Sequence, residues 1–383
     1  MPQASPLSLE TERRAVTVTA AMIVRDEERH LPDCLATLAG AVDEIVIVDT
    51  GSRDRSCEIA QAFGARLQHH RWVDDFAAAR NAALETASGE WILYIDADER
   101  LRLPQGGRLA DYLNPAAAGC LVRFRPKSGF TRYREWRLFR NDPRIRFKGK
   151  IHESMVEAVM RVSASDAAPV VQTKVEIDHL GYDGDLSLKF ARNLPLLRDA
   201  VVVNPDRIYL WLDLAEALAG LGHADEARLA AAEGLARTPQ AGNERARATA
   251  SMLRQFVARD ALARGIDCLE QIELGLTIAP EDWALVYLRG CALLQRGQPA
   301  PALDVAQTLL TVDADAMQDE LLAFDRAIFE EKALQLAALS SWRLGSRSQA
   351  AEYFGKAAKL TAGASTSQKR AVKTAALGHA AAA

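Results

Sequence analysis

The chain has little cysteine, no long apolar run and no excess of positive charge. Its 383 residues include five cysteines, which are widely spaced and form no CxxC pair. This spacing argues against a disulfide framework or a thiolate zinc site and favours a reducing compartment. No segment approaches the ~20 apolar residues that a bilayer-spanning helix needs, and the first residues lack the apolar core of a signal peptide. We therefore expect a cytoplasmic protein with no transmembrane segment.

The charge balance excludes a further group of functions. A net charge of −4 and a pI near 6.0 give no general attraction to nucleic acid or anionic lipid. Residues 122–150 are a local exception, with eleven Lys or Arg, two acids and interleaved aromatics. Nucleic-acid grooves share this pattern, but no nucleic-acid-binding motif accompanies it, so we expect no nucleic-acid partner. The segment is interpreted as two strands with a basic solvated face, of which a few residues could line an anion-binding cleft.

Strand-like and helix-like patterns alternate over the first hundred residues. Apolar runs predict strands at residues 16–24, 44–49, 65–72 and 91–95. Helical spacing predicts helices at 31–39, 54–63 and 76–87. Strands that alternate with single helices indicate a parallel sheet wound in the Rossmann manner. The dinucleotide fingerprint GxGxxG is absent after the first strand, so a nicotinamide cofactor is not expected.

Carboxylates follow two of the predicted strands at the point where each strand ends. Asp49 ends the second strand, and Asp96 and Asp98 follow the fourth. Ligands bind such sheets beyond the carboxyl ends of the strands. Two carboxylates spaced i, i+2 can share a divalent cation, and Mg²⁺ prefers one or two carboxylates plus substrate phosphates. The alternative is a solvated strand end, because a motif this short also arises by chance.

Several separated motifs together resemble a known family. The sequence reads "AAMIVRDEERHLPDCLATL", "VDEIVIVDTGSRDRSCEIAQAFGA" and "FAAARNAALETASGEWILYIDADE" in this order. In order and spacing these segments, over about residues 17–100, resemble the nucleotide-sugar-binding half of family 2 glycosyltransferases with the GT-A fold. The later "RLFRN", "IRFKGKIHE" and "HLGY" resemble the bacterial branch that carries C-terminal tetratricopeptide repeats.

The resemblance implies roles for particular residues. It implies that Asp49 contacts the nucleoside, that Asp96 lies near the ribose and that Asp98 contacts a divalent metal, Mg²⁺ or Mn²⁺. It also implies a donor that is a nucleotide-diphosphate sugar, with a UDP-sugar expected first. The nucleotide-sugar-binding set is then Asp49, Asp96, Arg80, Arg25 and Glu27. Arg80 matches a position near the diphosphate, with a helix-surface arginine as the alternative.

Two later residues are candidates for the chemistry. "GKIHESM" lacks the second histidine of HExxH, because Val156 stands there, so a zinc protease is excluded. An inverting sugar transfer needs a base for the acceptor proton, and Glu153 is our candidate, with a structural carboxylate as the alternative. His179 resembles the late histidine that completes the metal site in many GT-A enzymes, with a buried, hydrogen-bonded histidine as the alternative. His69 and His70 face opposite sides of a predicted strand and do not form a site on their own.

After about residue 190 alanine and leucine dominate and strand patterns disappear. Pro205 and Pro239 are 34 residues apart, and five residues between them fit the tetratricopeptide consensus, namely Trp211, Leu214, Ala215, Leu218 and Ala227. Turn glycines then predict four helix pairs, marked by Gly222, Gly265, Gly297 and Gly345. Such repeats stack into a solenoid with a concave face, whereas the alternative is a plain helical bundle.

These patterns predict an α/β GT-A (Rossmann-like) domain followed by an all-α solenoid. The predicted parts are an N-terminal tail (1–14), the GT-A domain (15–190), a connecting segment (191–204), the repeats (205–362) and a helical or frayed tail (363–383). The expected function is metal-dependent, inverting sugar transfer to a glycan, lipid-linked or polypeptide acceptor. The repeats are expected to help capture the acceptor or to bind a protein partner or a second copy of the chain. The alternative is a tetratricopeptide interaction scaffold with a catalytically idle transferase domain.

Overall fold

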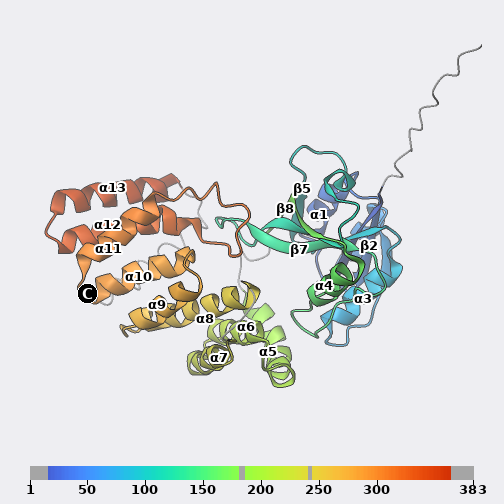
Figure 1. Cartoon of the computed structure of the whole chain (residues 1–383). Helices are drawn as coiled ribbons and strands as arrows, with labels where there is room; N and C mark the ends of the chain where they lie inside the picture. The colour runs from blue at the N-terminus through green and yellow to red at the C-terminus, as the bar shows by residue number, and fades with distance from the viewer. Residues whose placement is uncertain (1–15, 181–185, 240–243, 364–383) are drawn as a thin grey trace, which may run out of the picture. The chain divides into compact units, whose positions relative to one another are not determined.

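The computed structural model describes residues 16–180, 186–239 and 244–363. The expected N-terminal tail, Gly181 and Tyr182 of "HLGY", and the residues after 363 lie outside these ranges. The chain forms two compact units, coloured along the chain in Figure 1. The first unit contains the residues up to Val122, Trp136–Lys148 and Ser154–Glu176. The second contains Arg123–Glu135, Gly149–Glu153 and the chain from Ile177 onward.

The first unit is built on a parallel sheet, as the sequence predicts. Its four parallel strands are β1 (Val18–Val24), β2 (Glu44–Asp49), β3 (Arg66–His69) and β4 (Trp91–Tyr94). Helices α1 (Leu31–Leu38), α2 (Ser56–Ala62) and α3 (Phe76–Thr86) connect them. In the register of the sheet, Val24 lies opposite Asp49 and Asp49 lies opposite His69. The carboxyl ends of β1, β2 and β3 therefore reach the same edge.

The sheet as a whole is mixed, because further strands extend it and at least one of them is antiparallel. Four more strands follow, namely β5 (Glu99–Arg102), β6 (Gly119–Arg125), β7 (Tyr133–Arg140) and β8 (Val170–His179). The strand order is β3-β2-β1-β4-β7-β6-β8-β5, and β7 pairs antiparallel with β4. The remaining helical elements of this region are η1 (Leu109–Tyr112) and α4 (Val156–Asp166). The α/β class is confirmed, and the parallel prediction holds for the first four strands.

The core of the first unit explains why a glycine precedes β4. Thr19 of β1 is fully buried, and its hydroxyl donates to Glu44 at 2.6 Å and accepts the Gly89 N–H at 2.9 Å. A Cβ at Gly89 would lie 2.6 Å from the backbone nitrogen of Thr19. The chain can pass β1 this closely only without a side chain.

The second unit is dominated by helices that follow one another as a stack (Figure 1). They are α5 (Ser187–Val203), α6 (Ile208–Gly220), α7 (Ala224–Ala236), α8 (Glu244–Ala263), α9 (Leu269–Ile278), α10 (Trp283–Gln295), α11 (Pro299–Leu310), α12 (Glu331–Arg343) and α13 (Arg347–Gly363). Gly222, Gly265, Gly297 and Gly345 each lie in the turn of one pair, with φ of 85°, 69°, 75° and 81°. The four predicted helix pairs are confirmed. The expected connecting segment 191–204 forms most of α5.

An insertion between α11 and α12 lengthens the spacing between the turn glycines Gly297 and Gly345. It contains η2 (Arg326–Phe329) and pairs, within the second unit, with the connection between β6 and β7. The Thr131 N–H donates to the Phe324 carbonyl at 2.9 Å, and the Phe324 N–H donates to the Thr131 hydroxyl at 2.8 Å. The Arg326 N–H donates to the Gly129 carbonyl at 2.9 Å. Among the helices described, none is long and apolar enough to cross a membrane.

Candidate active site

The loops after β1 and β2 are joined by hydrogen bonds at the carboxyl edge of the sheet. The Asp26 N–H donates to the Ser52 hydroxyl at 3.0 Å, and the Arg53 N–H donates to the Asp26 carboxylate at 2.7 Å. The Glu27 N–H donates to the Ser56 hydroxyl at 2.8 Å. Of the two residues predicted in the first loop, Arg25 is exposed and Glu27 is partly buried. The two loops therefore form one ordered rim around the end of β2.

Asp49 lies inside this rim and is held as an anion. Its carboxylate accepts the Ser52 N–H at 3.0 Å and the Gly51 N–H at 3.2 Å, and Nδ1 of His69 lies 3.2 Å from its Oδ2. Burial alone would raise the pKa of Asp49, but the hydrogen bonds from Ser52, His69 and Gly51 lower it overall. The carboxylate is therefore ionised at neutral pH and can accept a hydrogen bond from a ligand.

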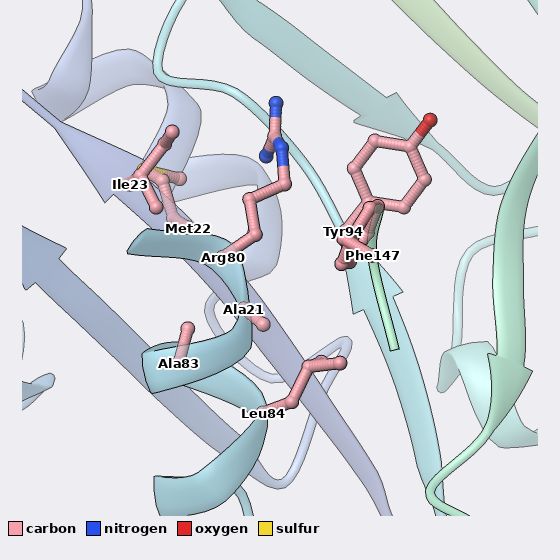
Figure 2. A pocket seen from close by; sticks show the side chains of 8 residues that line it. All are labelled: Ala21, Met22, Ile23, Arg80, Ala83, Leu84, Tyr94 and Phe147. Carbon is pink, nitrogen blue, oxygen red and sulfur yellow. The ribbon is translucent and has the colours of Figure 1, made fainter. Parts of the chain in front are cut away.

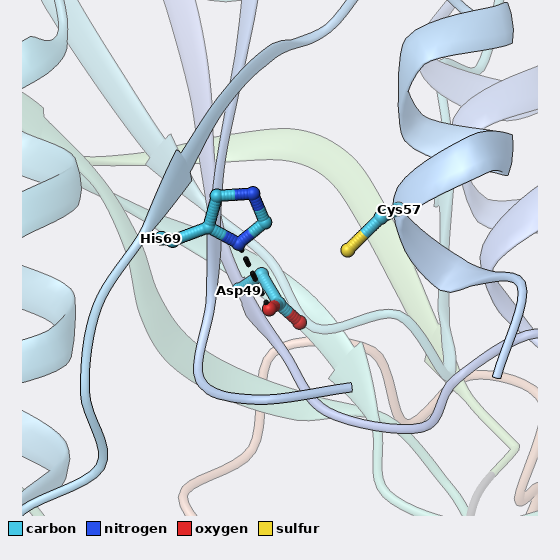
Figure 3. A group of neighbouring side chains, drawn as sticks. All are labelled: Asp49, Cys57 and His69. Carbon is cyan, nitrogen blue, oxygen red and sulfur yellow. Dashed lines mark hydrogen bonds and ion pairs between the residues drawn. The ribbon is translucent and has the colours of Figure 1, made fainter. Parts of the chain in front are cut away.

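Cys57 and His69 extend this part of the site beyond the residues predicted from sequence. Figure 3 shows both side chains directed toward Asp49. One ligand atom of each of the three residues lies within 4.8 Å of the others, and no other such group of three is found in the described part of the chain. A donor set of sulfur, imidazole nitrogen and carboxylate suits zinc better than magnesium. His69 could have been anticipated, because parallel pairing of β2 and β3 places it opposite Asp49.

Arg80 is buried and holds Asp96, so it is not a helix-surface arginine. Its Nη2 donates to Oδ1 of Asp96 at 3.0 Å, and only 9% of the residue is exposed. The guanidinium lies over the ring of Tyr94, 5.0 Å from its centroid, and 5.8 Å from that of Phe147. Figure 2 shows the arginine leaving α3 between β1 and these two rings. Stacking and pairing together fix the direction in which Asp96 points.

Asp98 and Glu99 follow Asp96 but differ in their environment. Asp98 is partly buried, whereas Glu99 is fully buried and accepts from Arg137 at 2.7 Å and from the Asp96 N–H at 3.0 Å. Burial raises the pKa of Glu99 to about 7 despite the opposing charge of Arg137, and the charges of Asp96 and Asp98 add to the shift. Asp96 and Asp98 offer oxygen donors, whereas Glu99 is occupied by Arg137 and the Asp96 N–H. Glu99 therefore has a structural role, and the sequence alone does not distinguish this role from those of Asp96 and Asp98.

Glu153 and His179 both belong to the second unit. Glu153 is partly buried and ends the Gly149–Glu153 segment. His179, at the end of β8, is buried, and its Nδ1 lies 3.0 Å from the Pro126 carbonyl oxygen. Its ring lies 6.1 Å from that of Phe124, centroid to centroid. The assignments of Glu153 as base and His179 as metal ligand stay predictions.

The basic stretch 122–150, which is divided between the two units, is partly neutralised by ion pairs with acids. Five of its arginines form ion pairs, which join Arg123 to Asp319, Arg125 and Arg132 to Asp178, Arg137 to Glu99, and Arg144 to Asp142 and Asp166. Asp178 is buried and Asp319 lies in the insertion of the helical repeats. Five of the eleven basic residues of this stretch therefore serve internal pairing.

The structure joins an α/β domain, whose parallel strands end in acidic residues, to a region of helical repeats. Residues 19–167 match the family model described as glycosyl transferase family 2. The chain therefore carries a family 2 glycosyltransferase domain followed by a tetratricopeptide-like helical region.

Individual relatives cover only parts of the chain. A TPR repeat-containing protein of Synechococcus elongatus is 41% identical over 179 residues, 44% of this chain and 43% of that protein. The SPbeta prophage-derived glycosyltransferase SunS of Bacillus subtilis is 27% identical over 203 residues, 50% of this chain and 46% of that protein. The chain thus spans less than half the length of these curated relatives. Among solved structures, S. aureus TarS 1-349 in complex with UDP-GlcNAc has a TM-score of 0.36 at 15% identity, over 74% of this chain and 93% of that one, which supports no conclusion.

Proposed function

We propose that this chain is a metal-dependent, inverting glycosyltransferase. It moves a sugar from a nucleotide-diphosphate donor, with UDP-sugars as the first candidates, to a glycan, lipid-linked or polypeptide acceptor. The observation that carries the proposal is the acidic sheet edge of a family 2 domain, where Asp49 is held ionised and Asp96 is oriented by buried Arg80. Burying an arginine is unfavourable unless it is paired, so this arrangement indicates a constrained site.

In this proposal each residue has a separate task. Asp49 accepts a hydrogen bond from the nucleoside, and Asp96 lies toward the ribose with Arg80 fixing its orientation. Arg25 and Glu27 belong to the loop after β1, which forms part of the rim around the end of β2. Asp98, with His179 as a second candidate ligand, would hold the divalent cation that neutralises charge on the departing diphosphate. Glu153 takes the proton of the acceptor hydroxyl or other nucleophile.

The test is release of UDP from a panel of UDP-sugars with Mn²⁺ or Mg²⁺, using the full chain. Asp98→Asn keeps the side-chain volume and removes the charge that a cation requires, so we expect metal-stimulated release to be lost. The matched control is Asp304→Asn, an exposed acid of α11, which should release UDP as the wild type does. Thermal unfolding should show that both variants stay folded.

Two outcomes would contradict the proposal. Metal-stimulated release that is unchanged in Asp98→Asn would remove the metal assignment. No release by the wild-type chain from any sugar nucleotide would favour the alternative, an interaction scaffold with an idle transferase domain.

A further inference from the structure

The segment that carries the candidate base is held by the first helical repeat. Arg207, the residue before α6, donates from Nη2 to the carbonyl oxygen of His152 at 2.6 Å. The same guanidinium packs against Gly149, where φ is +102° and a Cβ would lie 3.2 Å from Nη1 of Arg207. The Gly149–Glu153 segment and α6 belong to the same compact unit. One arginine thus contacts the backbone of the segment at two points.

His152 is held from its side chain as well. Its φ is +49°, a conformation that a non-glycine residue keeps only when its surroundings impose it. Its Nε2 lies 3.2 Å from Oδ2 of Asp213, and its ring meets the ring of Tyr209 edge-on, with centroids 5.4 Å apart. Burial, with the charges of Arg207 and Lys189, lowers the pKa of His152 to about 4, so the ring is neutral at neutral pH. The α6 side chains therefore impose the unusual backbone next to Glu153.

Arg207 is also linked electrostatically to Glu153. The guanidinium is partly buried, which lowers its pKa together with the positive charge of Arg245, and the charges of Asp213 and Glu153 oppose that shift. Its charge therefore acts on the carboxylate that follows His152, while its hydrogen bond fixes the backbone that carries this carboxylate.

We propose that Arg207 and Asp213 are positioning residues of the transferase, which hold the Gly149–Glu153 segment so that Glu153 can accept the acceptor proton. The inference rests on the proposed function, in which Glu153 is the base. The first repeat is then required for turnover itself, in addition to any role in acceptor capture.

The first experiment separates turnover from binding in full-length variants. UDP release is measured with the UDP-sugar that the wild type turns over fastest. We expect Arg207→Ala to lower kcat at least ~10-fold while KM and the affinity for UDP with Mn²⁺ stay within about twofold, because a base acts in the transition state. Arg207→Lys keeps a cationic donor and should recover part of the loss. The control is Arg296→Ala, an exposed arginine paired with Asp267, which should keep the wild-type kcat.

The second experiment asks whether Arg207 acts through Glu153. Glu153→Gln and the double variant with Arg207→Ala are compared, and we expect the double variant to be no slower than Glu153→Gln alone. Losses that multiply would overturn the inference. So would a wild-type kcat in Arg207→Ala when Glu153→Gln is slow. A fully active Glu153→Gln would instead contradict the base assignment of the proposed function.

Hydrogen exchange provides a readout that needs no substrate. Amides of residues 149–154 should exchange faster in Arg207→Ala, while those of β1 and β2 keep their wild-type rates. Unchanged exchange in this segment overturns the inference even if no donor is found. Asp213→Asn, which is nearly isosteric, is measured in the same way and replaces Arg207→Ala if that variant does not fold.

Discussion

Arg80 is the residue that most clearly links the interior of the first unit to its site. Its guanidinium is planar, so it can stack on Tyr94 and Phe147 and pair with Asp96 at the same time. An ammonium group has no plane to stack and no fixed pair of donors. Arginine is therefore required here by shape as well as by charge.

Replacing this residue tests its effect on nucleotide binding. Arg80→Lys loses the stacking and the fixed geometry of a charged hydrogen bond, which contributes about 1.5–3 kcal/mol. We expect the affinity for UDP with Mn²⁺, measured by calorimetry, to fall roughly 10- to 100-fold. The control is Arg66→Lys, at the beginning of β3 and thus at the opposite end of the strand from His69. An affinity equal to that of the wild type would show that Arg80 only fills the core.

Some site residues could be predicted from sequence because the local pattern reveals them. Asp49, Asp96 and Asp98 each follow an apolar strand, and this alone places them at the ligand-binding edge. Cys57, Glu99 and Arg207 have no such local pattern. Their roles depend on which distant side chain folding places beside them, such as Arg137 beside Glu99. Only the register of the sheet, as for His69, provides a partial rule for such pairs.

At the scale of elements, the start of a helix can be predicted where a capping residue in the local sequence fixes it. The predicted start of α3 at Phe76 is correct, because Asp75 caps the helix by accepting the Ala78 N–H at 2.9 Å. The strands after β4 were not placed individually. In β7, "YREWRLFR", charged and apolar residues do not alternate strictly, so its pattern did not reveal how the strand pairs.

Two glycine substitutions test how closely elements approach. Gly89→Ala would place a Cβ 2.6 Å from the backbone of β1, which cannot move aside as a side chain could. We expect a loss of unfolding free energy of about 1–3 kcal/mol. Gly355→Ala, within α13, meets nothing within 4 Å and should stabilise the helix by about 0.5–1 kcal/mol. Urea unfolding measures both, and equal effects would contradict the packing argument.

At the scale of the whole molecule, the two compact units do not correspond to two halves of the sequence. The transferase region contributes Arg123–Glu135 and Gly149–Glu153 to the unit that contains the repeats. The hydrogen bonds between Thr131 and Phe324 and the bidentate pair of Arg123 with Asp319 show why. Sequence periodicity could predict the repeats, but it could not predict that their insertion would pair with the β6–β7 connection.

This pairing makes a specific residue important for stability. Thr131 is 2% exposed, and Thr131→Val keeps its shape while removing the acceptor of the Phe324 N–H. Leaving that buried donor unpaired should lower the free energy of unfolding by about 1–3 kcal/mol. The same change at exposed Thr277 of α9 should have little effect. Urea unfolding of the two variants is the measurement, and similar midpoints would mean that water replaces the lost acceptor.

The pairing of Arg123 with Asp319 also has a consequence for synthesis of the chain. The two residues are 196 positions apart. At about 5–20 residues per second, a ribosome needs roughly 10–40 s to add Asp319 after Arg123. During that time Arg123 of β6 and the buried Thr131 of the connection between β6 and β7 lack their final partners. The transferase region, although it is made first, completes these contacts only when the insertion between α11 and α12 has left the ribosome.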